Sequence, residues 1–338
     1  MINRHTPVAH AAYLDLLRSW QDETVSEIRG AATPVTRNGK TYWYDSYRIG
    51  QEVRKTYIGE DSPELRERLN RKKALTAASQ DRRKHRARLI RILRAEGFLG
   101  VDATTGSLLS AMSRAGVFRL GGTIVGTHAF RLYEGTLGVR YSFDQMAQTG
   151  DLDIASFERL SLALQDTVSP PLQQVLGDFS FAPVPGLEQE KVWRWQQTRN
   201  ELLVEFLTPS FEDDEGIRPL PALGVDAHSL HHLNYLIAEP VPAIAVYRSG
   251  ILVQVPRPER FAIHKLIVAD RRRDGADSLK AHKDRMQAEF LIRVLAQDRP
   301  DDLKDAYDDA LSSGPKWGQR IEKSLKLLSG SRDILNGL

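Results

Sequence analysis

The chain has 338 residues, 41% of them hydrophobic and 27% charged, which is long enough for two or three domains with buried cores. It contains no cysteine, which excludes disulfides, thiolate catalysis and cysteine-held zinc and fits a reducing cytoplasm. The net charge of +3 is too small to argue for nucleic-acid binding by itself.

Hydropathy gives no sign of export or of a membrane span. No run of about 18 apolar residues occurs, and the N-terminus lacks the basic-then-apolar order of a signal peptide. We therefore expect a cytoplasmic protein without a membrane partner. The sequence leaves the oligomeric state open.

Residues 1–100 are predicted to form a small N-terminal α+β region. Apolar spacing predicts a helix over 8–29, and the Thr- and Tyr-rich stretch 33–58 predicts an antiparallel sheet that turns at Asn38-Gly39. A long basic helix follows over about 63–97.

The basic helix and the sheet each have two interpretations. We expect the basic residues to form a solvated helix face and the sheet aromatics to be buried against that helix. The alternative is a contact with nucleic acid or an acidic partner, to which the aromatic sheet would contribute.

Residues 101–257 are predicted to form a mixed α/β unit. The expected helices cover 106–116, a segment from about Thr127, 156–167 (ended by Pro170-Pro171) and 229–238. The expected strands are a buried one around Phe118–Val125, then DLDIA, FSFAPVP, VWRWQQ, ELLVEFL and a hairpin over 242–256 that turns at Ser249-Gly250. Residues 208–222 read as an acidic loop.

Residues 258–338 are predicted to be helical throughout. A helix starts at Pro258, and breaks are expected at Pro300 and at Gly314-Pro315.

Two aspartates separated by one residue occur in the segment TGDLDIA. Side chains two residues apart share a strand face, so Asp151 and Asp153 point together while Leu152 and Ile154 face the core. Two carboxylates this close repel each other unless a cation lies between them, and Mg²⁺ prefers such oxygen ligands. A surface turn with two solvated aspartates is the simpler alternative.

A third carboxylate and a glycine turn accompany this pair. Glu205 lies between apolar neighbours in a predicted strand, where a charge is costly without a partner. Gly126 and Thr127 lie between a predicted strand and a helix N-terminus, where backbone N–H groups and the helix dipole attract phosphate. By itself, this turn is more often an ordinary strand-to-helix connection.

Together these segments resemble the nucleotidyltransferase fold of the DNA polymerase beta superfamily. Val125-Gly126-Thr127 is similar to its first motif, Asp151-Leu152-Asp153 to its second, and Glu205 to its third carboxylate. The turn has Gly-Thr rather than Gly-Ser, and the third acid is Glu rather than Asp. A bacterial family of nucleotidyltransferase-fold proteins is similar over about 115–330, in GTHAF, YEGTLG, TGDLDIA, VEFLTP and PRPERFAIHKLIVADRR.

The resemblance implies an α/β (α+β) fold with a small mixed sheet flanked by helices. It implies Mg²⁺-dependent transfer of a nucleoside monophosphate from an NTP, with release of pyrophosphate. Asp151, Asp153 and Glu205 would be the catalytic and metal-binding acids, holding two Mg²⁺ ions. Gly126 and Thr127 would bind the leaving phosphates.

Cations should neutralise those phosphates. Under the resemblance, Lys265 is the first candidate, Lys283 the second and Arg260 the third. The alternative for Lys265 is a lysine at the edge of a core helix whose ammonium reaches water.

The acceptor is open: RNA such as tRNA, a protein or a small molecule. A toxin or defence role enters by resemblance only. One alternative function is a catalytically silent binding protein of the same fold, which the intact acids argue against. A metal-dependent nuclease is another, although it does not require the glycine turn.

Several other residues could be metal ligands or contacts to phosphate or RNA, but simpler interpretations are available. His228, His231 and His232 fit a helix better than a metal site, and the acidic run 212–215 fits a solvated loop. His128 is expected to be structural, with a phosphate contact as the alternative. The arginines 271–273 suit a helix C-terminus, with an RNA contact as the alternative.

Overall fold

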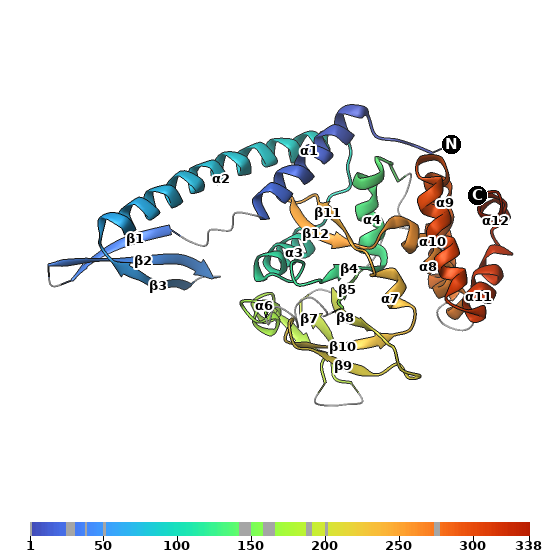
Figure 1. Cartoon of the computed structure of the whole chain (residues 1–338). Coiled ribbons are helices and arrows are strands. Elements are labelled where there is room, and N and C mark those ends of the chain that lie inside the picture. The colour runs from blue at the N-terminus through green and yellow to red at the C-terminus, as the bar shows by residue number, and fades with distance from the viewer. Residues whose placement is uncertain are drawn as a thin grey trace.

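The computed structural model describes residues 2–24, 31–37, 39–49, 52–141, 150–157, 166–186, 191–199, 202–273 and 278–338. Figure 1 shows a central part with sheets and helices, a helical C-terminal part, and a three-stranded sheet held away from both on a long helix. The predicted α/β (α+β) class is therefore confirmed. Among the described helices, none is both long and apolar enough to cross a membrane.

Among the described residues, seven strands form one mixed sheet at the centre of the molecule. Its order is β4-β5-β8-β10-β9, with β7 paired to β8 and β6 to β7. β8 is parallel to β5 and to β10, and the other pairs are antiparallel. The strands are β4 (Thr123–Ile124), β5 (Asp151–Ala155), β6 (Phe181–Pro183), β7 (Arg194–Gln197), β8 (Leu203–Pro209), β9 (Ile217–Leu220) and β10 (Val225–Leu230).

Along the two strands that carry the predicted acids, buried apolar side chains alternate with the acidic ones. Leu152 and Ile154 of β5 are fully buried, and so are Val204 and Phe206 of β8. Because successive side chains alternate between faces, burial of these apolar residues turns Asp153 and Glu205 to the opposite face. The core face thus fixes the direction of both carboxylates.

Helices and a second hairpin pack with this sheet around one hydrophobic core. They are α3 (Ala103–Ala115), α4 (Gly126–Leu137), α6 (Leu172–Asp178), α7 (Leu233–Leu236), and the antiparallel pair β11 (Val241–Ala245) and β12 (Ile251–Val255). Helix α4 packs against β5 and β11 and buries Phe130 and Tyr133 completely.

Helix α8 (Pro258–Arg271) links the sheet to the C-terminal helices. These are α9 (Ser278–Asp298), α10 (Pro300–Ser312), α11 (Pro315–Leu325) and α12 (Ser329–Asn336). α8 packs against α9, α10 and α11, and Ser324 of α11 donates a hydrogen bond to the Leu266 carbonyl oxygen (2.6 Å). The predicted helix start at Pro258 and the predicted breaks at Pro300 and Gly314-Pro315 are confirmed.

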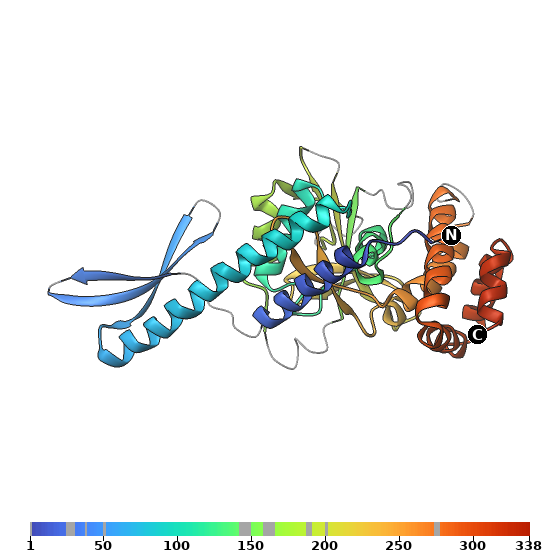
Figure 2. The same cartoon turned by 90° about the horizontal axis from the view of Figure 1, so that it is seen from above.

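The N-terminal residues form a helix pair and a projecting sheet. The elements are α1 (Pro7–Thr24), β1 (Ala31–Arg37), β2 (Lys40–Ile49), β3 (Glu52–Glu60) and α2 (Pro63–Ala95). We call residues 31–80, which hold β1–β3 and the first half of α2, the arm. Figures 1 and 2 both show its sheet at the end of α2, away from the rest of the molecule, which we call the body.

Several secondary-structure predictions were wrong. Only Thr123–Ile124 form a strand in the stretch predicted as buried strand, because turns hold residues 116–121. Val225–Leu230 alternate between buried and half-buried side chains, a strand period, so the predicted helix 229–238 shrinks to α7. The predicted loop 208–222 contains β9. Most of the predicted helix 156–167 lies outside the described residues.

The aromatic face of the arm is more exposed than expected. Tyr57 is 55% exposed, and Tyr42 and Tyr44 are only half-buried. Tyr57 lies 5.6 Å from Tyr44 and 6.2 Å from Tyr42 between ring centroids. Helix α2 meets the sheet at its first turns, where the buried Leu65 side chain lies against Gly59. Burial of these tyrosines against the helix is therefore incomplete.

Tyr13 anchors α1 to the body. Its ring is fully buried against Gly135, where an added Cβ would lie 2.1 Å from the ring, and its hydroxyl accepts the Ile244 N–H (3.0 Å). The predicted domain boundaries at 100/101 and 257/258 stay predictions, and this contact crosses the first of them.

Tyr13→Phe tests that anchor, because it keeps the ring and removes only the acceptor. A buried N–H without its acceptor costs about 1–3 kcal/mol, so the free energy of unfolding should fall by that amount in urea titrations. Tyr57→Phe on the exposed arm is the matched control and should change nothing. Equal midpoints for both variants would contradict the anchor.

Candidate active site

Asp153 lies directly against the turn that opens α4. Gly126 has a φ of +64°, and a Cβ added there would lie 2.2 Å from Asp153 Oδ2. The Val125 N–H donates to the Asp153 carbonyl oxygen (2.9 Å), which joins the turn to β5 through the backbone. The predicted phosphate turn and Asp153 of the predicted acid pair are therefore in contact.

Glu205 lies opposite Asp153 in the parallel register of β5 and β8. The two carboxyl groups are close enough to act on each other's pKa. Burial, then the charge of Glu205, then that of Asp151 raise the pKa of Asp153 to about 7, while Lys265 and Arg272 oppose the shift. Burial also raises the pKa of Glu205, and Arg194 opposes it. Asp153 therefore retains a proton above the usual pH range of a carboxyl group.

Asp151 stands at the exposed start of β5, paired in register with Leu203. It lies on the same strand face as Asp153, and its charge raises the pKa of both Asp153 and Glu205. The structure thus brings all three predicted acids to one electrostatic neighbourhood, with Asp151 on the solvent side.

Lys265 is held by a buried ion pair instead of facing the site alone. Its ammonium contacts Asp284, which also accepts from Arg272 (3.0 Å), and the Asp284 side chain is 4% exposed. Lys265 and Arg272 still act on Asp153, since both lower its pKa. Sequence reasoning missed Asp284 and the site role of Arg272. The only local indication in the sequence was that Asp284 directly follows the candidate cation Lys283.

Lys283 is half-buried beside the acids. Burial and then Lys265 lower the pKa of its ammonium, and Asp284, Asp151 and Asp153 oppose that shift. Arg194 of β7 lies opposite Glu205 in register, 3.9 Å from its carboxylate. Pattern reasoning missed Arg194, because only the strand pairing places it there.

Arg260 is engaged at another place in the fold. It donates to Asp309 (2.6 Å), and its guanidinium lies 4.8 Å above the Tyr235 ring. These contacts join α8 to α7 and α10. A phosphate-binding role for Arg260 stays a prediction.

The first turn of α4 has unfilled hydrogen-bonding capacity. Val125 is its N-cap and supplies no side-chain acceptor, so helix N–H groups there remain available to a ligand. Thr127 and His128 follow, both buried. Burial and then Arg131 lower the pKa of His128 to about 4, and its Nε2 has no hydrogen-bond partner. His128 is therefore neutral at pH 7.

The donor set fits Mg²⁺ shared with a substrate better than a closed metal cage. Among the described residues, no three His, Asp or Glu side chains are gathered closely enough to hold a metal ion on their own. Mg²⁺ commonly takes only one or two carboxylates and completes its shell with water and substrate phosphates. Asp153 and Glu205, with Asp151 beside them, offer such a partial set of oxygen ligands.

The histidines of 228–232 do not converge. His228 lies against Trp193 (4.8 Å), His231 Nδ1 meets Glu215 (3.1 Å), and His232 lies against Trp317 (4.4 Å). Glu215 also binds Arg271 (2.8 Å), so the acidic loop is partly ordered by ion pairs. Within the described chain, these residues form no metal group.

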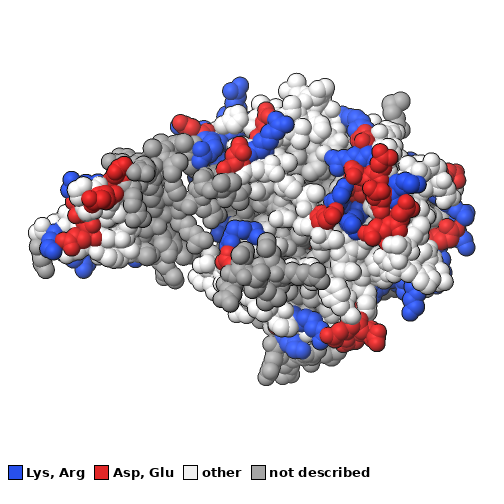
Figure 3. Space-filling view, viewed as in Figure 1, with Lys and Arg blue, Asp and Glu red and all other residues white. Residues whose placement is uncertain are grey.

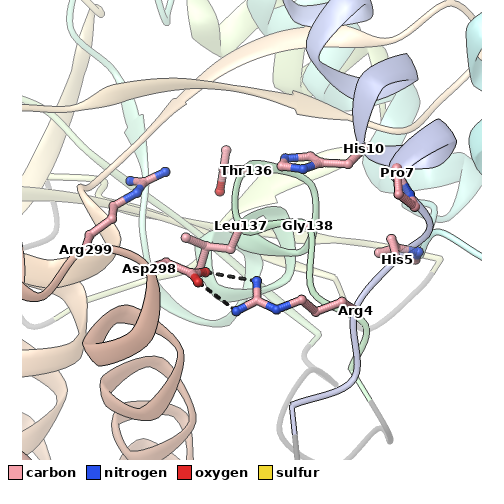
Figure 4. Close-up of a pocket in the computed structure, with 9 residues that line it drawn as sticks. All are labelled: Arg4, His5, Pro7, His10, Thr136, Leu137, Gly138, Asp298 and Arg299. Atoms are coloured by element: carbon pink, nitrogen blue, oxygen red, sulfur yellow. Dashed lines mark hydrogen bonds and ion pairs between the residues drawn. The ribbon is translucent and has the colours of Figure 1, made fainter.

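A separate pocket lies beside the N-terminal segment (Figure 4). Its volume is about 450 Å³, and Arg4 closes one side by pairing with Asp298 (2.7 Å). None of the predicted site residues lines it. The lining residues are Arg4, His5, Pro7, His10, Thr136, Leu137, Gly138, Asp298 and Arg299.

Gly126→Ala should displace the Asp153 carboxylate, because the new methyl group would occupy its place and φ would be strained. We expect nucleotide binding to weaken at least tenfold in a fluorescent-nucleotide titration. Gly177→Ala is the control, since a Cβ there meets nothing within 4 Å. Equal affinity for both variants would separate the turn from the site.

The raised pKa of Asp153 predicts a pH-dependent stability. Between about pH 4 and 7 the folded protein holds a proton that the unfolded chain has lost, so stability falls as pH rises through that window. With divalent ions chelated, Asp153→Asn should therefore gain on the wild type by roughly 1–3 kcal/mol from pH 5 to pH 8. Urea midpoints measure this, and parallel pH profiles for the two proteins would contradict it.

Comparison with known proteins places this geometry in a family. Residues 103–312 match the model of a family described as nucleotidyltransferase, a span that includes Gly126, Asp151, Asp153 and Glu205. Residues 10–67 match a model described as a domain of unknown function. No curated protein and no solved structure matches the chain. Since the first model covers more than half of the chain, the protein belongs to this nucleotidyltransferase family.

Proposed function

We propose that the protein transfers a nucleoside monophosphate from an NTP to an acceptor and releases pyrophosphate, in the manner of the DNA polymerase beta superfamily. The observation that carries the proposal is the contact between Asp153 and Gly126, with Glu205 opposite in register. It joins an acid cluster to a helix N-terminus, which are the two halves of a site for a metal-bound triphosphate.

Each residue of the candidate site has a role in the proposed reaction. Asp151, Asp153 and Glu205 would hold Mg²⁺, which when bound polarises the phosphate and lowers the pKa of an acceptor hydroxyl. The N–H groups and hydroxyl at Gly126 and Thr127 would bind phosphate oxygens.

The cations would have different roles in the reaction because they lie at different positions. Lys283, on whose pKa the charges of Asp151 and Asp153 act, would be the phosphate partner. Lys265 and Arg272 are held by Asp284 and would supply fixed positive charge near the acids.

Asp153→Asn and Asp151→Asn test the proposal. With each α-labelled NTP, Mg²⁺ and a cell extract as acceptor source, transfer of label should fall at least 100-fold in either variant. Asp178→Asn, an exposed carboxylate on α6, should transfer as the wild type does.

The class of labelled product identifies the acceptor as RNA, protein or small molecule. Nucleotide binding without any transfer by the wild type would favour the silent binding protein. Cleaved nucleic acid without pyrophosphate would favour a nuclease.

A further inference from the structure

A second group of charges lies where α2 joins the body. Arg83 on α2, Arg114 at the end of α3 and Arg248 in the β11–β12 turn are all exposed. Partial desolvation of the Arg114 guanidinium, then the charges of Arg248 and Arg83, lower the pKa of Arg114, so both of those guanidinium groups lie near that of Arg114. We call them the arginine cluster.

Trp20 of α1 contacts both α2 and the β11–β12 turn, and a separate hydrogen bond joins α3 to β12. The Trp20 indole N–H donates to the Ser249 carbonyl oxygen (3.1 Å), next to Arg248. The Arg86 guanidinium lies 4.0 Å above the Trp20 ring, and Arg83 stands one turn earlier on the same helix face. On the other side, Ser113 donates to the Leu252 carbonyl oxygen (3.4 Å), which ties the end of α3 to β12.

The arginine cluster has no acidic partner in the described part of the chain. The Arg248 guanidinium lies 5.1 Å above its neighbour Tyr247, and no carboxylate pairs with any of the three. The C-terminal helices differ, because acidic and basic side chains lie side by side there (Figure 3). Arg257, for example, pairs with Asp302 (2.9 Å). Like charges gathered without a counter-ion favour the binding of an anion.

The arm adds a face suited to bases. Tyr42 and Tyr44 alternate onto one face of β2, and Tyr57 of β3 touches both. Lys55 shares the face of Tyr57 and is exposed. Half-exposed aromatic rings beside cations are what single-stranded nucleic acids use for base stacking and phosphate contact.

We propose that the arginine cluster and this tyrosine face bind one single-stranded nucleic acid. From Pro63 to Arg83, α2 spans about 30 Å at 1.5 Å per residue, roughly nine stacked nucleotides at 3.4 Å each. A single strand is favoured over a duplex because its base faces are accessible to the tyrosines. The proposed transferase function would make this nucleic acid the acceptor, but the binding itself does not depend on catalysis.

The test uses full-length protein carrying Asp151→Ala and Asp153→Ala, so that binding is read without transfer. Fluorescence anisotropy follows labelled single-stranded RNA and DNA of 12 nucleotides, and a duplex of the same length. Adding Arg83→Gln, Arg114→Gln and Arg248→Gln should weaken single-strand binding at least tenfold. The slope of log affinity against log salt should shrink by about 2, because three phosphate contacts of about 0.7 each are lost.

The matched control removes three exposed lysines of the C-terminal helices, Lys304→Gln, Lys316→Gln and Lys323→Gln. It has the same change in net charge and should bind within twofold of its parent. The arginine variant should melt no lower than its parent, since its substitutions relieve repulsion. Tyr57→Ser, on the exposed face, should weaken binding about fivefold or more with an unchanged salt slope.

Three results would overturn the proposal: no single-strand binding by the parent, equal losses in the arginine and lysine variants, or duplex bound as tightly as single strand. Because every protein in the test is catalytically disabled, none of these results bears on whether the wild type transfers nucleotide. The RNA and DNA arms tell the two possible strands apart.

Discussion

The parallel pairing of β5 with β8 sets Asp153 and Glu205 side by side. The repulsion between these two carboxylates accounts for the proton and the cations found around them. Buried Leu152, Ile154 and Phe206 hold the strands in that register, so the acids cannot turn away from each other. The resulting repulsion is relieved by a retained proton and by the cations Arg194, Lys265 and Arg272. A bound divalent ion would relieve it further.

The remaining architecture supports this pair from both sides. Gly126 lets the first turn of α4 approach Asp153 so closely that any side chain would collide. Asp284 of α9 binds both Lys265 of α8 and Arg272, the residue that caps the end of α8. The C-terminal helices therefore hold the positive field in place, which gives the packing of α8 against α9 a consequence for the site.

Local sequence patterns predicted the parts of the site that sit on a single element. The alternation in DLDIA gave the shared face of Asp151 and Asp153, and the glycine turn gave the start of α4. Residues that enter by pairing were missed: Arg194 reaches Glu205 only because β7 lies beside β8, and Asp284 meets Lys265 only across two helices. The helix predicted over 229–238 is shortened to α7, and its predicted start became part of a strand because Val225–Leu230 pair with β8 and β9. The partial exposure of the arm tyrosines likewise depends on where α2 carries their sheet.

The central claim is that the three acids and the opening turn of α4 form one site for a metal ion and a triphosphate together. Water-proton relaxation during Mn²⁺ titration, with and without a non-hydrolysable NTP analogue, tests it most directly. Because the chain offers only a partial ligand set, Mn²⁺ should bind weakly alone and at least tenfold more tightly with the analogue, and Asp153→Asn should abolish that gain. Mn²⁺ affinity that is indifferent to the analogue, or unchanged in Asp153→Asn, would contradict the account.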